Sequence, residues 1–328
     1  MNLNKKNILI TGGTGSFGRA CVKHILKNFK PNKLVIFSRD ELKQFEMAQE
    51  LQKTNSKNNC LRFFLGDVRD KDRLDLALKG INYVIHAAAL KQVPAAEYNP
   101  MEFVKTNIIG AENIIFASIN NKVERVISLS TDKAANPINL YGATKLAADK
   151  LFIAANNLSR GKPIFSSVRY GNVLGSRGSV VPFFKSYREN KSQSIPITDI
   201  NMTRFFISLK DSVKFVLNSL NLMKGGEIFV PKIPSVKIVD LAKAIVPNRK
   251  HKIIGVRPGE KIAEVLITKD ESKNTLEFTN HYVINSEIFG NHNKNKYKLK
   301  DFEYNSLMNK HFLNEKQIKK ICENLKLI

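Results

Sequence analysis

The chain has 328 residues, 43% of them hydrophobic, which is enough for a sizeable core in one large domain or in a domain with a smaller lobe. Its formal net charge is +24, but the basic residues are scattered and form no long block or nucleic-acid-binding motif. We therefore interpret most of the charge as solvated surface with some attraction for anionic substrates, and nucleic-acid binding stays a minor alternative. The three cysteines, Cys21, Cys60 and Cys322, are too widely separated to suggest a metal site or a disulfide framework.

The first residues lead directly into an apolar strand without the features of a secretory signal. No apolar run is long enough to cross a bilayer. These observations predict a cytoplasmic protein with free thiols and no contact with membranes.

Short apolar runs alternate with amphipathic stretches through the first half of the chain. The apolar runs, each bounded by Gly, Asp or Ser, predict strands over residues 7–11, 34–38, 61–65, 83–86 and 126–130. The stretches between them predict helices over residues 17–28, 41–51, 70–78 and 101–120. This alternation predicts an α/β fold with a Rossmann-like, doubly wound parallel sheet, in which ligands bind beyond the carboxyl ends of the strands.

The second half of the chain is more broken. A helix over 140–156 and a strand over 164–170 come first, and beyond Gly171 repeated prolines separate short elements. Two further helices are predicted there, over 209–222 and 238–245. This part predicts a smaller C-terminal α/β lobe that covers the cleft and binds the substrate.

A glycine-rich loop follows the first predicted strand and opens the first predicted helix. Its glycines fit G-x-G-x-x-G at Gly13, Gly15 and Gly18, and a related spacing that begins at Gly12. Glycine permits the tight turn and the close approach of backbone to a pyrophosphate, while the helix N-terminus supplies amide donors. A simple glycine-rich turn is the lesser alternative. The residues expected to bind the cofactor here are Gly12, Thr14, Gly15, Ser16, Phe17 and Gly18.

In a dinucleotide site, the residue at the end of the second strand contacts the ribose. The second predicted strand of this chain ends near Ser38. Ser38 carries no charge, whereas Arg39 and Lys43, one helical turn further on, are placed to grip a 2′-phosphate. This pattern favours NADP over NAD. Asp40 leaves NAD open, because an acidic residue serves the ribose in NAD sites. The alternative for Arg39 is a solvated side chain that pairs with a helix carboxylate.

The ends of the next two strands complete the predicted cofactor site. Asp67, followed by Val68, is placed to accept a hydrogen bond from the adenine amino group, with a helix N-cap as the alternative. His86 is interpreted as a satisfied core histidine. Three small residues after it would let the cofactor lie flat: Ala87, Ala88 and Ala89.

The segment after the fifth strand holds the candidate catalytic residues. Tyr141 and Lys145 are four residues apart, so they share one face of the predicted helix. A neighbouring ammonium would lower the pKa of the phenol and make it a base near neutral pH. Asp132 and Lys133 form a second acid/base pair, which suggests more than a single hydride transfer. Each pair alone would be interpreted as exposed residues or a surface salt bridge, and the dinucleotide loop favours the catalytic interpretation.

With these residues assembled, the sequence resembles the extended short-chain dehydrogenase/reductase family. More narrowly, it is similar to the inverting UDP-N-acetylglucosamine 4,6-dehydratases. The resemblance covers roughly residues 5 to 285 and rests on motifs that are specific in combination. They include TGGTGSFG, GDVRDKDRL, HAAALKQVPAAEYNP, STDKAANPINLYGATKLAADKLF, RYGNVLGSRGSVVPFF and GVRPGEK.

The resemblance implies a dehydration that regenerates its cofactor. Tyr141, helped by Lys145, takes the proton of the sugar 4-hydroxyl while carbon 4 gives hydride to the nicotinamide, and Thr131 hydrogen-bonds the 4-oxygen. Lys133 then removes the proton from carbon 5, Asp132 as an acid helps the 6-hydroxyl leave as water, and hydride returns to carbon 6. Reprotonation from the opposite face inverts carbon 5.

Lysine at position 133 favours inversion, because similar dehydratases that keep the carbon-5 configuration carry Asp-Glu at the positions of Asp132 and Lys133. A lysine base must be neutral, which predicts a lowered pKa for Lys133. An acid at Asp132 must hold its proton, which predicts a raised pKa, and the pair is expected to titrate as one unit.

Further residues are carried over from the resemblance. Lys91 is expected to face the sugar, and Asn107 holds either a bent turn near the site or an ordinary polar helix position. The residues expected to bind the UDP moiety are Asn172, Arg177, Arg204, Arg257 and Glu260.

Two alternatives remain for the function. A UDP-sugar 4-epimerase would need Tyr141 and Lys145 but not Asp132 with Lys133. A non-catalytic dinucleotide sensor or nucleic-acid-binding protein belongs to a different class. The resemblance also implies a homo-oligomer, a hexamer, and a place in the biosynthesis of pseudaminic acid-type sugars.

The sequence therefore predicts three parts. Residues 1–170 form an NADP-binding Rossmann domain that includes the catalytic helix. Residues 171–285 form a mainly substrate-binding lobe that is interleaved with the first domain. Residues 286–328 form a C-terminal extension without an assigned role.

Overall fold

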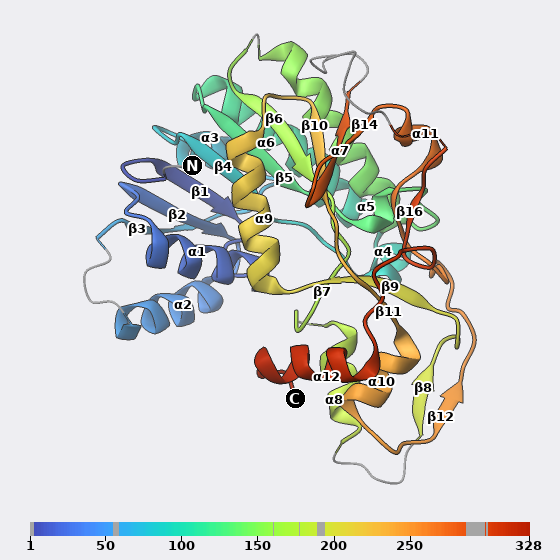
Figure 1. The fold of residues 1–328 in the computed structure, drawn as a ribbon. Helices are drawn as coiled ribbons and strands as arrows, with labels where there is room; N and C mark the ends of the chain where they lie inside the picture. The colour runs from blue at the N-terminus through green and yellow to red at the C-terminus, as the bar shows by residue number, and fades with distance from the viewer. Residues whose placement is uncertain are drawn as a thin grey trace.

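A nine-stranded sheet forms the centre of the molecule (Figure 1). The computed structural model describes residues 3–54, 59–159, 161–176, 178–188, 194–286, 299 and 301–328. The strand order β14-β15-β10-β6-β5-β4-β1-β2-β3 is parallel from β3 to β10, and β15 and β14 are added antiparallel. The strands are β1 (Asn7–Thr11), β2 (Lys33–Ser38), β3 (Leu61–Leu65), β4 (Tyr83–His86), β5 (Arg125–Leu129), β6 (Ile164–Val168), β10 (Glu227–Pro231), β14 (Thr275–Glu277) and β15 (His281–Asn285). The predicted Rossmann-like, doubly wound sheet is confirmed.

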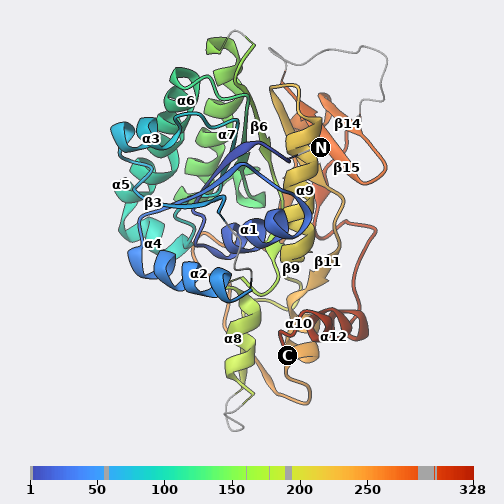
Figure 2. The ribbon, with the colours of Figure 1, turned by 90° about the vertical axis from the view of Figure 1, so that its left-hand side faces the viewer.

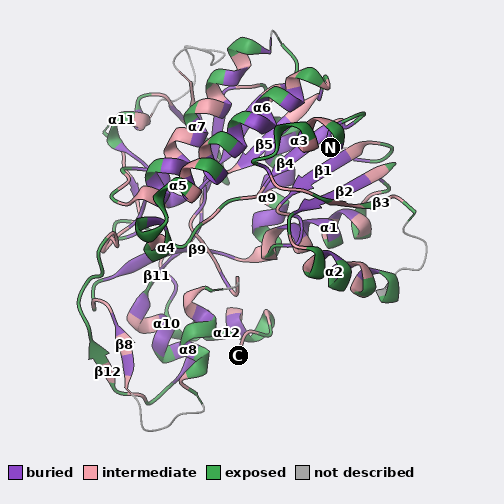
Figure 3. Ribbon diagram, turned by 180° about the vertical axis from the view of Figure 1, so that it is seen from behind, coloured by how far each residue is buried: buried purple, intermediate pink, exposed green. Residues whose placement is uncertain are grey.

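Helices cover both faces of this sheet, because neighbouring residues of a strand point to opposite sides. In β1, Ile8 and Ile10 pack into one apolar core and Leu9 packs into another. The strands are therefore buried between helices whose outer faces are exposed (Figure 3). The first core is covered by α1 (Ser16–Asn28), α2 (Glu41–Thr54) and α9 (Leu209–Leu222), and the second by α3 (Lys71–Ala77), α6 (Gly110–Asn120) and α7 (Leu140–Leu158).

The predicted single helix over 101–120 is wrong in its middle. The structure has α4 (Val93–Tyr98), α5 (Pro100–Phe103), a π-helix η1 (Val104–Ile109) and then α6. A π-helix widens the turn by one residue, and such turns occur frequently at functional sites. Asn107 lies in this turn.

A smaller lobe lies below the sheet (Figure 2). Its apolar core contains Val181, Ile195, Phe206 and Leu241 among its buried residues. Its elements are β7 (Asn172–Val173), α8 (Val180–Ser186), β8 (Ile195–Ile197), β9 (Thr203–Ile207), β11 (Ser235–Lys237), α10 (Ile238–Ile245), β12 (His251–Ile253) and α12 (Glu315–Asn324). β13 (Val265–Ile267) and β16 (Tyr304–Asn305) pack into the first core of the main sheet, and α11 (Lys269–Ser272) lies above the lobe (Figure 1). The lobe places its own residues over the carboxyl ends of the central strands.

The described C-terminal residues 301–328 pack against both the main sheet and the smaller lobe. β16 pairs antiparallel with β13, and Ile318 and Cys322 of α12 are buried in the same apolar core as α10. Residues 301–328 therefore take part in the fold around the cleft. The division of the chain at residues 170 and 285 stays a prediction, and β10, β14 and β15 from the later part extend the main sheet.

Candidate functional site

One large cavity, of about 960 Å³, lies at the carboxyl ends of the central strands and is closed by the smaller lobe. Every sequence-predicted site residue that the structure describes lines it. Arg177 falls outside the described residues. The structure therefore brings the predicted residues together, while the role of each one stays a prediction.

The glycine loop forms one end of this cavity. A Cβ at Gly18 would lie 2.5 Å from the Cα and carbonyl oxygen of Gly13, so glycine is needed for the loop to pack against its own helix. Gly12 has a φ of +62°, and a Cβ there would lie 2.9 Å from the carbonyl oxygen of Ala87. The N-cap of α1 is Gly15, which makes no side-chain cap, and the positive dipole end of the helix lies at the cavity.

Two arginines share the carboxylate of Asp67 beside this loop. Nη1 of Arg39 lies 3.6 Å from Oδ2 of Asp67, and 57% of the Arg39 side chain is exposed. The Arg69 backbone and guanidinium donate to both oxygens of Asp67. The helix N-cap is Asp70, whose side chain accepts from the Arg73 amide at 2.9 Å, so the N-cap alternative for Asp67 is wrong. The ionic partner of Arg39 is Asp67, which follows strand β3, and not the helix carboxylate of the alternative interpretation. Lys43 pairs with Asp40.

Burial alone would raise the pKa of Asp67, but its hydrogen bonds to Arg69 and the nearby Arg39 outweigh burial and lower that pKa. Asp67 is therefore ionised at neutral pH and holds the guanidinium of Arg39 at the mouth of the cavity. This arrangement keeps a cation at the mouth of the cavity, beside the glycine loop.

His86 locks the end of β4 to the end of β1. Its Nδ1 lies 2.9 Å from the hydroxyl oxygen of Thr11, which also accepts from the amides of Ala87 and Ala88 at 3.1 and 3.2 Å. The Thr11 hydroxyl therefore donates its hydrogen to Nδ1, which requires a neutral imidazole. Burial and the nearby Lys145 lower the pKa of His86 to about 3. The interpretation as a satisfied core histidine is confirmed.

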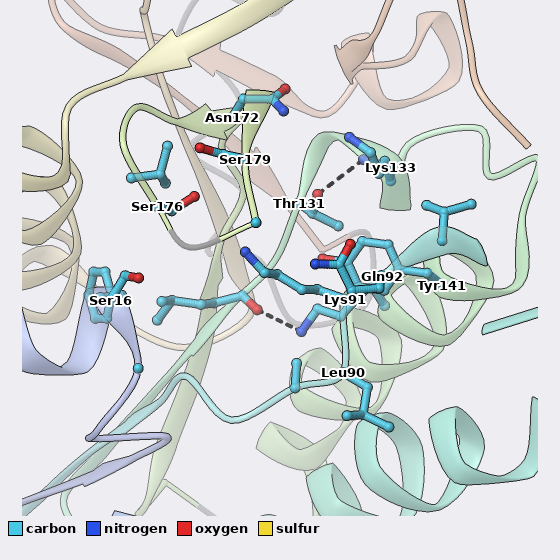
Figure 4. A pocket seen from close by; sticks show the side chains of 18 of the residues that line it. Ser16, Leu90, Lys91, Gln92, Thr131, Lys133, Tyr141, Asn172, Ser176 and Ser179 are labelled. Carbon is cyan, nitrogen blue, oxygen red and sulfur yellow. Dashed lines mark hydrogen bonds between the residues drawn. The ribbon is translucent and has the colours of Figure 1, made fainter. Parts of the chain in front are cut away.

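Asn107 holds the loop after β4. Its side-chain oxygen accepts from the Leu90 amide at 2.9 Å, and its amide nitrogen donates to the Leu90 carbonyl and to the Thr144 hydroxyl at 3.0 Å each. The π-turn thus places the buried side chain of Asn107 where it hydrogen-bonds both the backbone amide and the backbone carbonyl of Leu90. Lys91 follows and extends into the pocket (Figure 4), and burial lowers its pKa.

The catalytic candidates gather where β5 ends. The Thr131 hydroxyl donates to Oδ1 of Asp132 at 3.0 Å and accepts from the Lys133 amide at 3.4 Å. Tyr141 begins the first turn of α7 and faces the same space (Figure 4). Asn172 lies across the pocket from it and contributes a buried side-chain oxygen without a hydrogen-bond partner among the described residues.

The expected lowering of the Tyr141 pKa is not found in the protein alone. Burial raises the pKa of the phenol to about 12, although the Lys133 ammonium and a hydrogen bond with Thr131 oppose it. Nζ of Lys145 donates to the Leu129 carbonyl at 2.6 Å, and burial lowers its pKa although Asp149 opposes this. Tyr141 is therefore a neutral phenol at neutral pH.

The expected lowering of the Lys133 pKa is also wrong for the protein alone. Burial favours the neutral amine, but the carboxylates of Asp132 and Glu264 outweigh burial and raise the pKa of Lys133. Nζ lies 3.1 Å from Oδ1 of Asp132 and 3.1 Å from Oε1 of Glu264. Lys133 is therefore an ammonium held between the carboxylates of Asp132 and Glu264.

Glu264 is the functional candidate that sequence reasoning missed. Only 2% of its side chain is exposed, and it reaches Lys133 from the segment before β13. No local pattern marks it, because the contact joins residues that lie far apart in the chain. Arg204, predicted to bind UDP, lies 3.7 Å from Glu264 through Nε, and its Nη1 donates to the carbonyls of Thr203 and Ile262.

The other predicted UDP ligands lie at the cavity wall formed by the smaller lobe. Arg257 pairs with Glu260 at 3.8 Å and is half-exposed. Oε2 of Glu260 is buried without a hydrogen-bond partner among the described residues. The side chain of Asn139 donates to the Gly259 carbonyl at 2.8 Å and ties this wall to the start of α7.

A parallel doubly wound sheet with a glycine loop at its switch point, and a second lobe over the cleft, defines a dinucleotide-binding enzyme of the extended short-chain dehydrogenase/reductase class. The chain belongs to the polysaccharide biosynthesis protein family, whose model matches residues 8–286. Within the described residues, no helix has the length and apolar character needed to cross a membrane.

Known relatives agree with this class. The chain is 60% identical over 286 residues to a UDP-N-acetylglucosamine 4,6-dehydratase (inverting) of Campylobacter jejuni strain 81-176, covering 87% of this chain and 84% of the relative. It is 48% identical over 288 residues to a UDP-glucose 4-epimerase of Rickettsia bellii, covering 85% and 82%. The solved structure of Pen from Bacillus thuringiensis is 37% identical, has a TM-score of 0.89, and is matched over 99% of this chain and 100% of that chain. The predicted resemblance to the inverting dehydratases is confirmed.

We expect Asn107→Ala to loosen the loop after β4. The substitution removes the side-chain partner of the half-buried amide and carbonyl of Leu90, at a cost of up to about 1–3 kcal/mol for each group, which is the penalty for a fully buried one. Hydrogen exchange of the Leu90 amide should become faster and the thermal midpoint should fall. Asn120→Ala, at an exposed position at the end of α6, is the control and should change neither. Unchanged exchange at Leu90 would contradict the assigned role of Asn107.

His86 should destabilise the protein in acid. Its pKa is near 6.5 when unfolded and about 3 when folded, so the unfolded state binds a proton that the folded state does not. The free energy of unfolding should therefore decrease as the pH falls from about 6.5 toward about 3. Chemical denaturation at pH values across this window should show a smaller decrease for His86→Asn, whose oxygen can still accept from Thr11. Equal pH dependence in the two proteins would disprove the claim.

Proposed function

We propose that the protein dehydrates UDP-N-acetylglucosamine to a UDP-4-keto-6-deoxy-N-acetylhexosamine with inversion at carbon 5, as an NADP-dependent lyase. The observation that carries the proposal is the contact of 3.1 Å between Nζ of Lys133 and the carboxylate of Asp132 in the cavity that also holds Tyr141. An epimerase needs no such second pair. The identity of 60% to an inverting dehydratase supports the same choice over the epimerase, where the identity is 48%.

The residues at the glycine loop fit a dinucleotide. Added Cβ atoms at Gly12 and Gly18 would clash with backbone, so the backbone there packs as closely as a pyrophosphate site needs. Arg39 and Lys43 would hold a 2′-phosphate, which favours NADP. When bound, the nicotinamide supplies a reversible hydride acceptor for the sugar.

Tyr141 would act on the sugar 4-hydroxyl. The phenol is buried and neutral at pH 7, with a pKa of about 12 in the protein alone. It therefore needs positive charge beside it before it can accept a proton, and Lys133 already acts in that direction. Thr131, hydrogen-bonded to the phenol, would orient it toward the 4-oxygen.

Lys133 and Asp132 would carry out the elimination by exchanging one proton. Transfer of a proton from Nζ to Oδ1 across 3.1 Å leaves a neutral amine and a carboxylic acid. The amine is the base that removes the carbon-5 proton, and the acid is the group that protonates the departing 6-hydroxyl. The contact therefore produces both required species without an external proton.

This proposal is tested by incubating the protein with UDP-N-acetylglucosamine and NADP in D₂O and recording proton NMR spectra. A new methyl signal, deuterium at carbon 5 and nuclear Overhauser contacts of the inverted configuration are expected. A mixture of gluco and galacto sugars without a methyl signal would mean an epimerase. Absence of turnover together with tight duplex-DNA binding at physiological salt would favour the nucleic-acid alternative.

Tyr141→Phe and Lys133→Ala should each reduce turnover by about 10²- to 10⁴-fold, the range for a positioned acid or base. Lys133→Ala should leave cofactor affinity unchanged. Lys232→Ala removes a lysine paired with Glu277 away from the cavity and should keep the wild-type rate. A near-normal rate in either cavity variant would remove that residue from the mechanism.

Arg39→Ala should weaken NADP binding by about tenfold to a hundredfold, since a hydrogen bond to a charged group contributes about 1.5–3 kcal/mol. NAD binding should change little, because it lacks the 2′-phosphate. Isothermal titration with both cofactors measures the two effects, and Arg62→Ala on β3, whose guanidinium donates to the Asn59 and Leu61 carbonyls, serves as the control. Tighter binding of NAD than of NADP by the wild-type protein would overturn the choice of cofactor.

We also propose that the protein works in the cytoplasm as a homo-oligomer, a hexamer by the resemblance, in a pseudaminic acid-type sugar pathway. Sedimentation velocity would measure the assembly directly.

A further inference from the structure

Two buried carboxylates meet one ammonium at the centre of the cavity. Asp132 and Glu264 are 1% and 2% exposed, and each places an oxygen 3.1 Å from Nζ of Lys133. The second oxygen of each, Oδ2 and Oε2, has no hydrogen-bond partner among the described residues. A buried carboxylate with an unpaired oxygen is costly, so its retention beside a reactive lysine calls for an explanation.

The two carboxylates differ in what surrounds them. Arg204 lies 3.7 Å from Oε1 of Glu264, while Asp132 accepts from Thr131 and Lys133. A neighbouring guanidinium favours the ionised form of a carboxyl group. Glu264 therefore has a second cationic partner in Arg204, whereas Lys133 is the cation beside Asp132.

Glu264 is fixed by the C-terminal segment. Its amide donates to the Ser306 hydroxyl at 2.9 Å, and the Ser306 amide donates to the Glu264 carbonyl at 2.8 Å. The Ser306 hydroxyl also lies 2.8 Å from that of Thr203, in the strand that carries Arg204. Nearby, Lys261 donates to the Ala135 carbonyl at 2.8 Å and ties the same segment to the loop that holds Lys133.

We propose that Glu264 is a positioning residue for the elimination: held beside Arg204, it keeps Nζ of Lys133 against Asp132 and thereby directs the lysine proton to Oδ1 of Asp132. The inference rests on the proposed function, because it assigns a task within the same site. It also gives the C-terminal segment a role, since Ser306 fixes the backbone of Glu264.

The charges around Lys133 predict how the site responds to the loss of Glu264. The charged and titratable groups that face it are Asp132, Glu264, Arg204, Tyr141 and Lys261. Removing the Glu264 charge leaves more positive charge around the Lys133–Asp132 pair. Both groups should then lose protons more easily, so both limbs of the pH–rate profile should move to lower pH.

The test compares Glu264→Gln with the wild-type enzyme and with Glu277→Gln, a surface glutamate paired with Lys232. We expect Glu264→Gln to lower kcat about 10- to 100-fold, the range for loss of an outer partner of a functional group. Its pH–rate profile should move to lower pH while NADP affinity stays unchanged. Glu264→Asp keeps the charge and should restore the pH profile even where the rate stays low.

A second measurement does not depend on turnover. The ¹³C shift of the Lys133 side chain, assigned with Lys133→Ala, should titrate at lower pH in Glu264→Gln than in the wild type, and Ser306→Ala should shift it less in the same direction. A wild-type rate and pH profile in Glu264→Gln, or an unchanged lysine titration, would overturn the positioning role and leave the dehydratase intact. A wild-type enzyme that forms no 6-deoxy product would instead overturn the proposed function.

Discussion

The ammonium of Lys133 between two buried carboxylates is the interaction on which the proposed chemistry depends. Lys133, Asp132, Glu264 and Arg204 together carry two positive and two negative charges. Separate burial of any one of these charges would be strongly unfavourable, and removing one partner of a buried pair leaves the other uncompensated. The cluster is therefore stable only when the sheet and the smaller lobe bring all four residues together.

Three distant parts of the chain supply this cluster. The end of β5 provides Asp132 and Lys133, β9 provides Arg204, and the segment before β13 provides Glu264. Hydrogen bonds from Asn139 and Lys261 to backbone carbonyls join the segment of Glu264 to the catalytic loop, and Ser306 fixes it from the C-terminal side. The smaller lobe thus completes the active centre as well as covering it.

The local sequence was sufficient to predict those elements whose structure is determined by their own residues. The first five strands begin and end within one residue of their predicted bounds, because short apolar runs between turn residues have few other solutions. The glycine loop and the Tyr141–Lys145 pair were also found this way. The sequence leaves both a bent turn and an ordinary helix position open for Asn107, and the structure shows the turn. The contacts of Asn107 with Leu90 that accompany it are not visible in helical periodicity.

The pKa directions could not be predicted, because they depend on burial and on distant partners. The phenol of Tyr141 was expected to be acidified by Lys145, yet burial dominates and its pKa is about 12. The amine of Lys133 was expected to be neutral, yet Glu264 joins Asp132 in holding its proton. For Lys133 the missing information was its contact with Glu264, far away in the sequence, and for Tyr141 it was the extent of its burial.

The same burial that keeps Tyr141 neutral also prepares the lysine pair for reaction. An ion pair and its neutral form, amine with carboxylic acid, differ in how strongly water stabilises them, and a drier site favours the neutral form. In the proposed reaction, bound substrate would exclude water from the 22% of the Lys133 side chain that is exposed in the protein alone. Proton transfer to Asp132 then leaves Glu264 and Arg204 as one balanced pair, so the cluster stays neutral in total before and after the transfer. Substrate binding would therefore drive the site from a resting ion pair to the neutral base and the neutral acid that the elimination needs.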